Sequence, residues 1–164
     1  MSKKIAVLAG SFDPFTNGHF NLTQRAQSLF GEVHLLVATS PNKAGWIPKE
    51  QRVQSIQDLF EKDTSVRVME YDGLVAEYQV KGCETVLVRG IRDSVDLALE
   101  QKLAFANQEI SPKLQTIWLP CAEDLRFVSS SLLREMNSYG KSVEKFLPSV
   151  VFQSLSQAGI LCSD

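Results

Sequence analysis

Short apolar runs alternate along this chain with longer segments in which apolar residues recur every three to four positions. Five of the short runs predict buried β-strands, at residues 4–9, 33–39, 66–71, 85–88 and 116–119. Helical periodicity covers residues 19–30, 49–62, 74–81 and a longer stretch from about 94, and two more helices are predicted near 130–137 and 149–157. This alternation indicates βαβ units and therefore a parallel sheet.

The predicted strands are almost continuously apolar, which is typical of a parallel sheet covered on both faces. The long predicted helix carries Leu99, Leu103, Ala106 and Ile110 on one stripe. We therefore predict an α/β fold, a Rossmann-like doubly wound sheet of five parallel strands with helices on both faces. A length of 164 residues suits one domain, so residues 1–164 are expected to form a single unit on which the helices after about residue 130 pack.

Charge and cysteine content narrow the classes of function. With 17 basic and 19 acidic residues the net charge is −2, which argues against a nucleic-acid-binding surface or a polybasic membrane patch. The three cysteines, at positions 83, 121 and 162, contain no CxxC pair, so neither a disulfide framework nor a zinc site is expected, and no residue is assigned as a metal ligand. No apolar stretch approaches the roughly 20 residues of a membrane span. We expect a soluble, cytoplasmic protein.

In an open α/β sheet, ligands bind beyond the carboxyl ends of the strands. The first such loop reads GSFDPFTNGH, from Gly10 to His19, and leads from the first strand into the first helix. Unpaired N–H groups and the positive dipole end of a helix start suit a phosphate, and His19 can donate a hydrogen bond there. An isolated Gly-His pair would more simply be a tight turn with a helix-capping histidine, but the whole ten-residue string favours the phosphate site.

Three cations follow other predicted strands. Lys43 lies in the string SPNK, and Arg89 and Arg92 lie in RGIR directly after the fourth strand. The planar guanidinium fork suits phosphate oxygens. The alternative is a cation that is simply solvated at the surface. For Lys43 taken alone this is the better interpretation, and for the two arginines together it is as good as phosphate binding. Three successive serines, 129–131, open a later helix, where they can cap it or present hydroxyl and N–H groups to a triphosphate.

These strings carry a resemblance to a known family. GSFDPFTNGH is similar to the (T/H)xGH signature of the nucleotidyltransferase superfamily, and VSSSLLRE resembles its second signature, ISS[ST]xxR. Together with SPNK and VLVRGIR, nearly the whole chain resembles the bacterial phosphopantetheine adenylyltransferase family. The resemblance implies a Rossmann-like nucleotidyltransferase domain. It also implies reversible transfer of an adenylyl group from ATP to 4′-phosphopantetheine, which gives pyrophosphate and dephospho-coenzyme A.

The resemblance also assigns roles to individual positions. It implies that the catalytic residues are His19, Lys43 and Arg92. The residues implied to bind the acceptor are Ser11, Lys43, Val75 and Arg89. The residues implied to contact ATP are Ser11, Phe12, His19, Gly90, Ile91, Arg92, Glu100, Leu125, Arg126, Phe127, Val128, Ser129, Ser130 and Ser131. Mg²⁺ as cofactor, product-side binding of coenzyme A and a homohexamer are further expectations from the family.

The chain departs from the family where an Asp-Phe-Glu-Tyr-Glu run is usual, because residues 96–100 read DLALE, so that Leu97 and Leu99 replace two aromatic residues. Position 125, often aromatic, is leucine. Two rival readings remain: a related enzyme that uses CTP or another acceptor, disfavoured by SPNK and RGIR, and a module that senses ATP without turnover. A redox Rossmann enzyme is excluded because no GxGxxG follows a strand.

Overall fold

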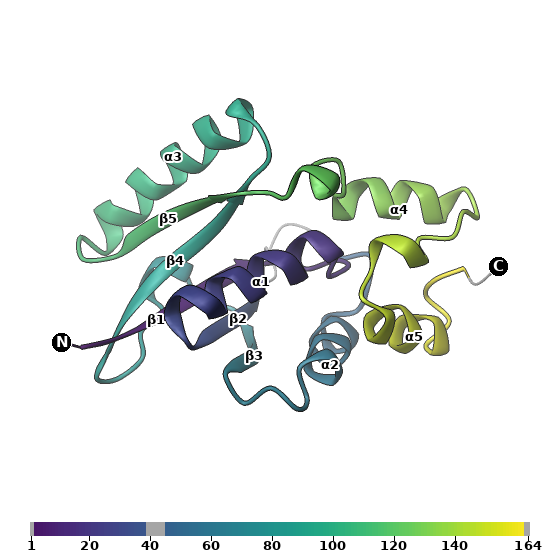
Figure 1. Ribbon diagram of the computed structural model, residues 1–164, viewed down its shortest axis with the longest axis horizontal. Coiled ribbons are helices and arrows are strands. Elements are labelled where there is room, and N and C mark those ends of the chain that lie inside the picture. The colour runs from purple at the N-terminus through teal and green to yellow at the C-terminus, as the bar shows by residue number, and fades with distance from the viewer. Residues whose placement is uncertain (1, 39–44, 163–164) are drawn as a thin grey trace.

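The structure, a computed structural model, describes residues 2–38 and 45–162. Five parallel strands form one sheet with the spatial order β3-β2-β1-β4-β5 (Figure 1). The strands are β1 (Lys3–Gly10), β2 (Val33–Ala38), β3 (Val66–Tyr71), β4 (Cys83–Ile91) and β5 (Gln115–Pro120). The predicted five-stranded parallel sheet is thus confirmed. The predicted site residue Lys43 lies outside the described residues.

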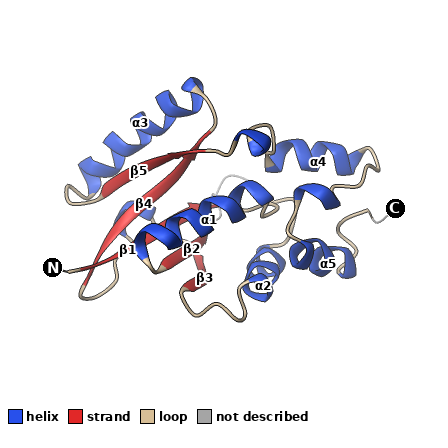
Figure 2. Cartoon of the chain, in the orientation of Figure 1, coloured by secondary structure: helices blue, strands red, loops and turns tan. Residues whose placement is uncertain are grey.

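Five α-helices cover the sheet and extend it at one end (Figure 2). They are α1 (Asn17–Phe30), α2 (Lys49–Leu59), α3 (Ser94–Ile110), α4 (Ser130–Ser138) and α5 (Ser149–Gln157). Helix α1 packs on β1, β2 and β4, α2 packs on β2, β3 and α5, and α3 packs on β4 and β5. The final helix therefore belongs to the same packed unit as the sheet.

Alternate side chains of the strands serve two different cores. On β1, Ala6 and Leu8 join a large buried cluster that includes Ala26 of α1 and residues of α5. Val7 and Ala9 join a smaller cluster on the other side, with Ala76 of the one-turn helix η1 (Val75–Glu77). Because successive residues of a strand point to opposite faces, these two clusters show that both faces are covered, as the doubly wound fold requires.

The strand order reverses at β1, which pairs with β2 on one side and with β4 on the other. The chain first builds β2 and β3 on one side and then returns to build β4 and β5. Connections that diverge in this way leave a crevice at the carboxyl ends of the two central strands. Gly10 ends β1 and residues 89–91 end β4, so the motifs singled out in the sequence meet at this crevice.

One sequence expectation for a helix is wrong. Residues 74–81 form only the single turn η1 instead of a helix, since side chains elsewhere in the fold fix this segment, as described below. On α3, Leu99, Leu103 and Ile110 of the predicted stripe are exposed in the single chain, and the buried residue of this helix is Ala104. Within the described part of the chain, no helix is both long and apolar enough to cross a membrane.

Candidate active site

Two neighbouring cavities open where the sequence motifs converge. The first, of about 400 Å³, lies between α3 and the sheet, and we call it the α3 cavity. The second, of about 440 Å³, lies over the ends of β1 and β4 and against the starts of α1 and α4, and we call it the loop cavity. The two cavities share wall residues, namely Ala9, Gly10, Ser11, Arg89 and Glu100. A group bound in one cavity therefore lies next to a group bound in the other.

His19 lies in the wall of the loop cavity at the start of α1. Its Nδ1 accepts a hydrogen bond from the backbone N–H of Thr16, at 3.0 Å, while the backbone N–H of His19 donates to the Thr16 hydroxyl. The rings of Phe12 and Phe15 pack on the imidazole, with centroids 5.1 and 5.4 Å away. This reciprocal capping box fixes both the start of the helix and the orientation of the ring.

The surroundings of His19 also determine its protonation state. Burial, with smaller effects from the positive charges of Arg89 and Arg92, lowers its pKa from 6.5 to about 4. The ring is therefore neutral near pH 7. Because Nδ1 accepts the Thr16 N–H, the single ring proton is on Nε2, which makes the side chain a neutral hydrogen-bond donor. The helix-capping role considered for this histidine is thus confirmed, while its role as a donor to phosphate stays a prediction.

Both arginines of RGIR are held by carboxylates of α3. Arg89 binds Glu100 through two hydrogen bonds, Nε–Oε2 at 2.8 Å and Nη2–Oε1 at 2.6 Å, and donates a third to the Ala9 carbonyl oxygen at 2.7 Å. Arg92 binds Asp96 in the first turn of α3, with Nε–Oδ2 at 2.7 Å and Nη2–Oδ1 at 3.1 Å. The guanidinium planes are thus oriented before any substrate arrives, which lowers the entropy lost on binding.

The three serines have separate roles. Ser129 is the N-cap of α4, and its hydroxyl accepts from the Leu132 N–H at 3.2 Å. Ser130 donates to the Pro14 carbonyl oxygen at 2.9 Å and so ties α4 to the first loop. Ser131 accepts from Arg134 at 3.3 Å. All three line the loop cavity, so the start of α4, a position that suits an anion in helices generally, lies in its wall.

A buried carboxylate joins the loops beneath this site. Asp13 is 2% exposed and accepts hydrogen bonds from the backbone N–H groups of Trp46 and Ile47, both at 2.8 Å. Arg134 of α4 also donates to it, at 3.2 Å. The buried Arg52 donates to the carbonyl oxygens of Ile47 and Ser11. These contacts hold the first loop, residues 45–47 and α4 in one arrangement.

Most of the predicted site residues come together. The loop cavity is lined by Ser11, Phe12, His19, Arg89, Gly90, Arg92, Glu100, Val128, Ser129, Ser130 and Ser131. Val75 lines the α3 cavity, together with the residues common to both. At Gly90, a Cβ atom would lie 3.3 Å from a Leu22 methyl group, so a side chain here would press on Leu22 in this wall of the loop cavity.

Four predicted residues are in the lining of neither cavity. Ile91 ends β4 and accepts the Cys121 N–H through its carbonyl oxygen, while Leu125 packs on the main core. Arg126 donates to the Arg92 carbonyl oxygen at 3.0 Å. Phe127 is 61% exposed and packs edge-to-face on Phe146. The segment 125–127 therefore supports the loop cavity from outside its wall.

Sequence reasoning missed the part of the α3 cavity that the helix itself provides. Leu103, Ala104 and Asn107 line it with Glu100, and Thr116 of β5 completes that wall. Positions 100, 103, 104 and 107 follow the i, i+3, i+4, i+7 spacing of one helix face. The helical spacing of these four positions could therefore be read from the sequence. Because the face combines polar and apolar residues, it does not stand out as a hydrophobic stripe. Asp96, also missed, lines the loop cavity.

Among the described residues, no group of three or more His, Cys, Asp or Glu side chains is arranged to hold a metal ion. Mg²⁺ in nucleotide sites usually keeps several waters and binds substrate phosphates with one or two carboxylates. The loop cavity is lined by two carboxylates, Asp96 and Glu100, and by the three serines at 129–131, and these described residues fit the small number of protein ligands that such an ion needs.

Comparison with known proteins agrees with this geometry. Residues 7–136 match the model of the cytidylyltransferase-like family. The chain is 39% identical over 154 residues to the phosphopantetheine adenylyltransferase of Stenotrophomonas maltophilia, covering 94% of this chain and 91% of the relative. The corresponding enzyme of Streptococcus suis is 36% identical, with 94% and 96% coverage.

A solved structure shares the fold at much lower sequence identity. It comes from Vibrio parahaemolyticus, is assigned as a nicotinate-nucleotide adenylyltransferase, and superposes with a TM-score of 0.66 at 19% identity. The match covers 96% of this chain and 94% of that chain. Together with the signatures at the two cavities and the full-length relatives, these matches show that the chain belongs to the phosphopantetheine adenylyltransferase family of cytidylyltransferase-like proteins.

Proposed function

We propose that this protein transfers the adenylyl group of ATP to 4′-phosphopantetheine, reversibly, with release of pyrophosphate and formation of dephospho-coenzyme A. The observation that carries this proposal is the common wall of the two cavities, which brings Ser11 and Arg89 into both. The loop cavity, with its serines, helix starts and Arg92, takes ATP. The α3 cavity, lined by Val75, Leu87 and Leu103, takes the acceptor's extended arm.

The reaction needs no general base from the protein. An oxygen of the acceptor phosphate attacks the α-phosphorus of ATP, and the bond from that phosphorus to the bridging oxygen of pyrophosphate breaks. The second pKa of a phosphate monoester is about 6, so the nucleophile is already ionised at neutral pH. The protein must instead hold two anions together and stabilise the charge that develops in the transition state.

The described residues supply these effects in distinct ways. His19 donates from a neutral ring, and its low pKa prevents it from protonating the nucleophile. Arg89 orients the acceptor phosphate at the shared wall, and Arg92, with the N–H groups at the start of α4, binds the nucleotide phosphates. We include Lys43 as a further cation on the acceptor side, on the basis of the family signature.

Four finer points complete the proposal. Mg²⁺ accompanies ATP and neutralises part of its phosphate charge. The protein acts in the cytoplasm, and coenzyme A, which shares the acceptor's arm, also enters the α3 cavity. The active form is a homohexamer, supported by the apolar side chains that α3 exposes in a single chain outside both cavities, namely Val95, Phe105 and Ile110. Light scattering coupled to gel filtration measures the mass of the assembly in solution and so tests the homohexamer directly.

The direct test incubates purified protein with ATP, Mg²⁺ and 4′-phosphopantetheine and follows pyrophosphate and dephospho-coenzyme A together. CTP and other phosphate monoesters serve as competing substrates, and a His19→Ala preparation controls for contaminating enzymes. Equal formation of both products, with ATP preferred, supports the proposal. Turnover only with a different acceptor would show that 4′-phosphopantetheine is the wrong acceptor. Binding of nucleotide without turnover on any acceptor would instead identify an ATP-sensing module.

A further inference from the structure

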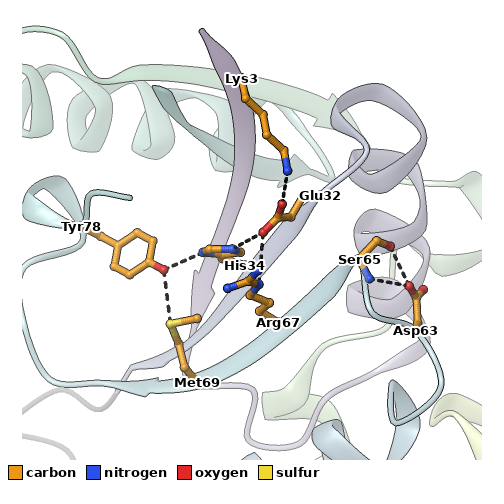
Figure 3. A network of polar contacts seen from close by, with 8 residues as sticks. All are labelled: Lys3, Glu32, His34, Asp63, Ser65, Arg67, Met69 and Tyr78. Atoms are coloured by element: carbon orange, nitrogen blue, oxygen red, sulfur yellow. Dashed lines mark hydrogen bonds and ion pairs between the residues drawn. The ribbon is translucent and has the colours of Figure 1, made fainter. Parts of the chain in front are cut away.

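A buried histidine on β2 connects the start of the sheet to the α3 cavity. His34 is 2% exposed and lies on the same face of β2 as Leu36 and Ala38, and Ala38 lines that cavity. His34 itself is not among the described residues that line either cavity. Figure 3 shows a chain of contacts that runs from Lys3 through Glu32 and His34 to Tyr78.

The hydrogen bonds of His34 are fixed by its neighbours. Its Nε2 lies 2.9 Å from a Glu32 carboxylate oxygen. Hydrogen bonds from Lys3 and His34 lower the pKa of Glu32 to about 2, so this carboxylate is ionised and only accepts. Nε2 therefore carries a proton. On the other side of the ring, Nδ1 lies 2.6 Å from the Tyr78 hydroxyl, and burial raises the pKa of this hydroxyl. The same hydroxyl also lies 3.3 Å from the sulfur of Met69 on β3 (Figure 3).

Tyr78 ends the segment that contributes Val75 to the wall of the α3 cavity. The segment 74–78 contains η1, and its internal bonds run from Glu77 N–H to the Leu74 carbonyl oxygen at 2.8 Å and from Tyr78 N–H to that of Val75 at 3.2 Å. At its other end, the Tyr71 hydroxyl donates to the Leu74 carbonyl oxygen at 3.0 Å. The rings of Tyr71 and Tyr78 pack edge-to-face with centroids 5.3 Å apart.

A single turn of this kind has too few internal hydrogen bonds to hold its place alone. Within it, Ala76 is buried in the smaller core and Val75 lines the α3 cavity. The sheet, through His34, therefore holds this segment at the Tyr78 hydroxyl, three residues after Val75. Such support of a binding wall from behind governs how well the wall is preorganised.

We propose that His34 is a positioning residue for acceptor binding, which acts through its hydrogen bond to Tyr78 to hold Val75 in the wall of the α3 cavity. The inference rests on the proposed function, because it assigns the α3 cavity to the arm of 4′-phosphopantetheine. Neither His34 nor Tyr78 touches the reacting atoms. Loss of their bond should therefore weaken binding of the acceptor and leave ATP binding and the chemical step unchanged.

The test uses Tyr78→Phe, which removes one oxygen and keeps the ring that packs on Tyr71. Steady-state kinetics should show a rise of about five- to tenfold in KM for 4′-phosphopantetheine, the effect of one lost hydrogen bond. The KM for ATP and kcat should change less than about twofold. His34→Phe should raise the acceptor KM in the same direction. The double variant should be no worse than Tyr78→Phe alone, because that change already removes the bond to His34 together with the 3.3 Å contact between the hydroxyl and the Met69 sulfur.

Arg67→Gln is the matched control. Arg67 contacts Glu32 at 3.2 Å in the same network, but it is not bonded to Tyr78. A purely structural role for the network predicts that all three variants lose thermal stability with an unchanged acceptor KM, which would overturn the inference. Amide hydrogen exchange at residues 76–78 gives a second readout, and we expect it to accelerate in Tyr78→Phe and not in Arg67→Gln.

The outcomes separate this inference from the proposed function. A wild-type protein that forms no dephospho-coenzyme A refutes the function and, with it, the acceptor assignment of the α3 cavity. A wild-type protein that is active, beside a Tyr78→Phe variant of unchanged acceptor KM, leaves the function standing and refutes the role of His34. Equal rises in the KM of both substrates would also contradict a role confined to the acceptor wall.

Discussion

Arg89 and Glu100 form a two-point ion pair that joins the end of β4 to α3, with N–O distances of 2.8 and 2.6 Å. The pair lies in the wall common to both cavities. Because Arg89 also donates to Ala9 of β1, its guanidinium is fixed from two directions. A phosphate that enters either cavity meets a cation that does not need to be oriented.

Replacement of Arg89 by lysine should show how much the fixed orientation of its guanidinium group contributes to acceptor binding. Lysine keeps the positive charge but cannot form the two-point contact with Glu100, so it loses orientation rather than charge. We expect the acceptor KM to rise at least about tenfold, the effect of losing one charged hydrogen bond. Glu100→Gln, which keeps the shape and removes the negative charge, should perturb the acceptor KM less. Unchanged acceptor kinetics in Arg89→Lys would contradict the assignment.

His19→Ala should lower kcat by about 10²–10³-fold, the range found when one preorganised donor to a developing charge is removed. Pre-steady-state measurement of pyrophosphate release separates the chemical step from product release. Because His19 also caps α1, circular dichroism must confirm that the variant is folded, and a folded variant with near-normal turnover would exclude this role.

The low pKa of His19 gives stability a specific pH dependence. The folded form titrates at about 4 and the unfolded form near 6.5, so between these values the unfolded chain binds more protons. The contribution of His19 is fully present above about pH 6.5 and is lost as the pH falls toward 4, at up to about 1.4 kcal/mol per pH unit. Urea unfolding at pH 7 and pH 5 should show a smaller difference in His19→Gln than in wild type. Equal differences would mean that His19 titrates normally.

Asp13→Ala should destabilise the fold by about 2–4 kcal/mol, because it leaves the buried N–H groups of Trp46 and Ile47 without acceptors. Asp72→Ala is the matched control, since it removes a carboxylate from an exposed ion pair with Lys49 and should change stability by less than about 1 kcal/mol. Chemical denaturation measures both. Equal effects on the free energy of unfolding would show that burial of Asp13 is not decisive.

The sheet and the phosphate-binding end of the site follow from local sequence. Strands buried on both faces leave unbroken apolar runs, and parallel strands bring their carboxyl ends to one edge. His19, Arg89, Arg92 and the serines at 129–131 could therefore be assigned to one edge from their positions alone, and they do share the loop cavity. The family prediction is confirmed by the relatives, whereas the individual roles of these residues remain predictions.

The parts that could not be predicted depend on contacts between distant segments. Asp13 is bonded to backbone N–H groups 33 and 34 residues away, which no spacing rule reveals. The segment 74–81 has helical periodicity, but tyrosine hydroxyls anchor it at both ends as a single turn. On α3, hydrophobicity pointed to the exposed stripe of Leu99 and Ile110, because the face toward the sheet borders a hollow and includes Glu100 and Asn107.

The common wall of the two cavities has a consequence for ligand design. A molecule that joins an adenosine group to an acceptor-like arm through a phosphate-sized link would occupy both cavities at once. Its second half would bind at an effective concentration set by the short link, so its affinity would exceed that of either half by orders of magnitude. Since Arg89 and Ser11 face both cavities, the link itself would lie against groups that bind phosphate.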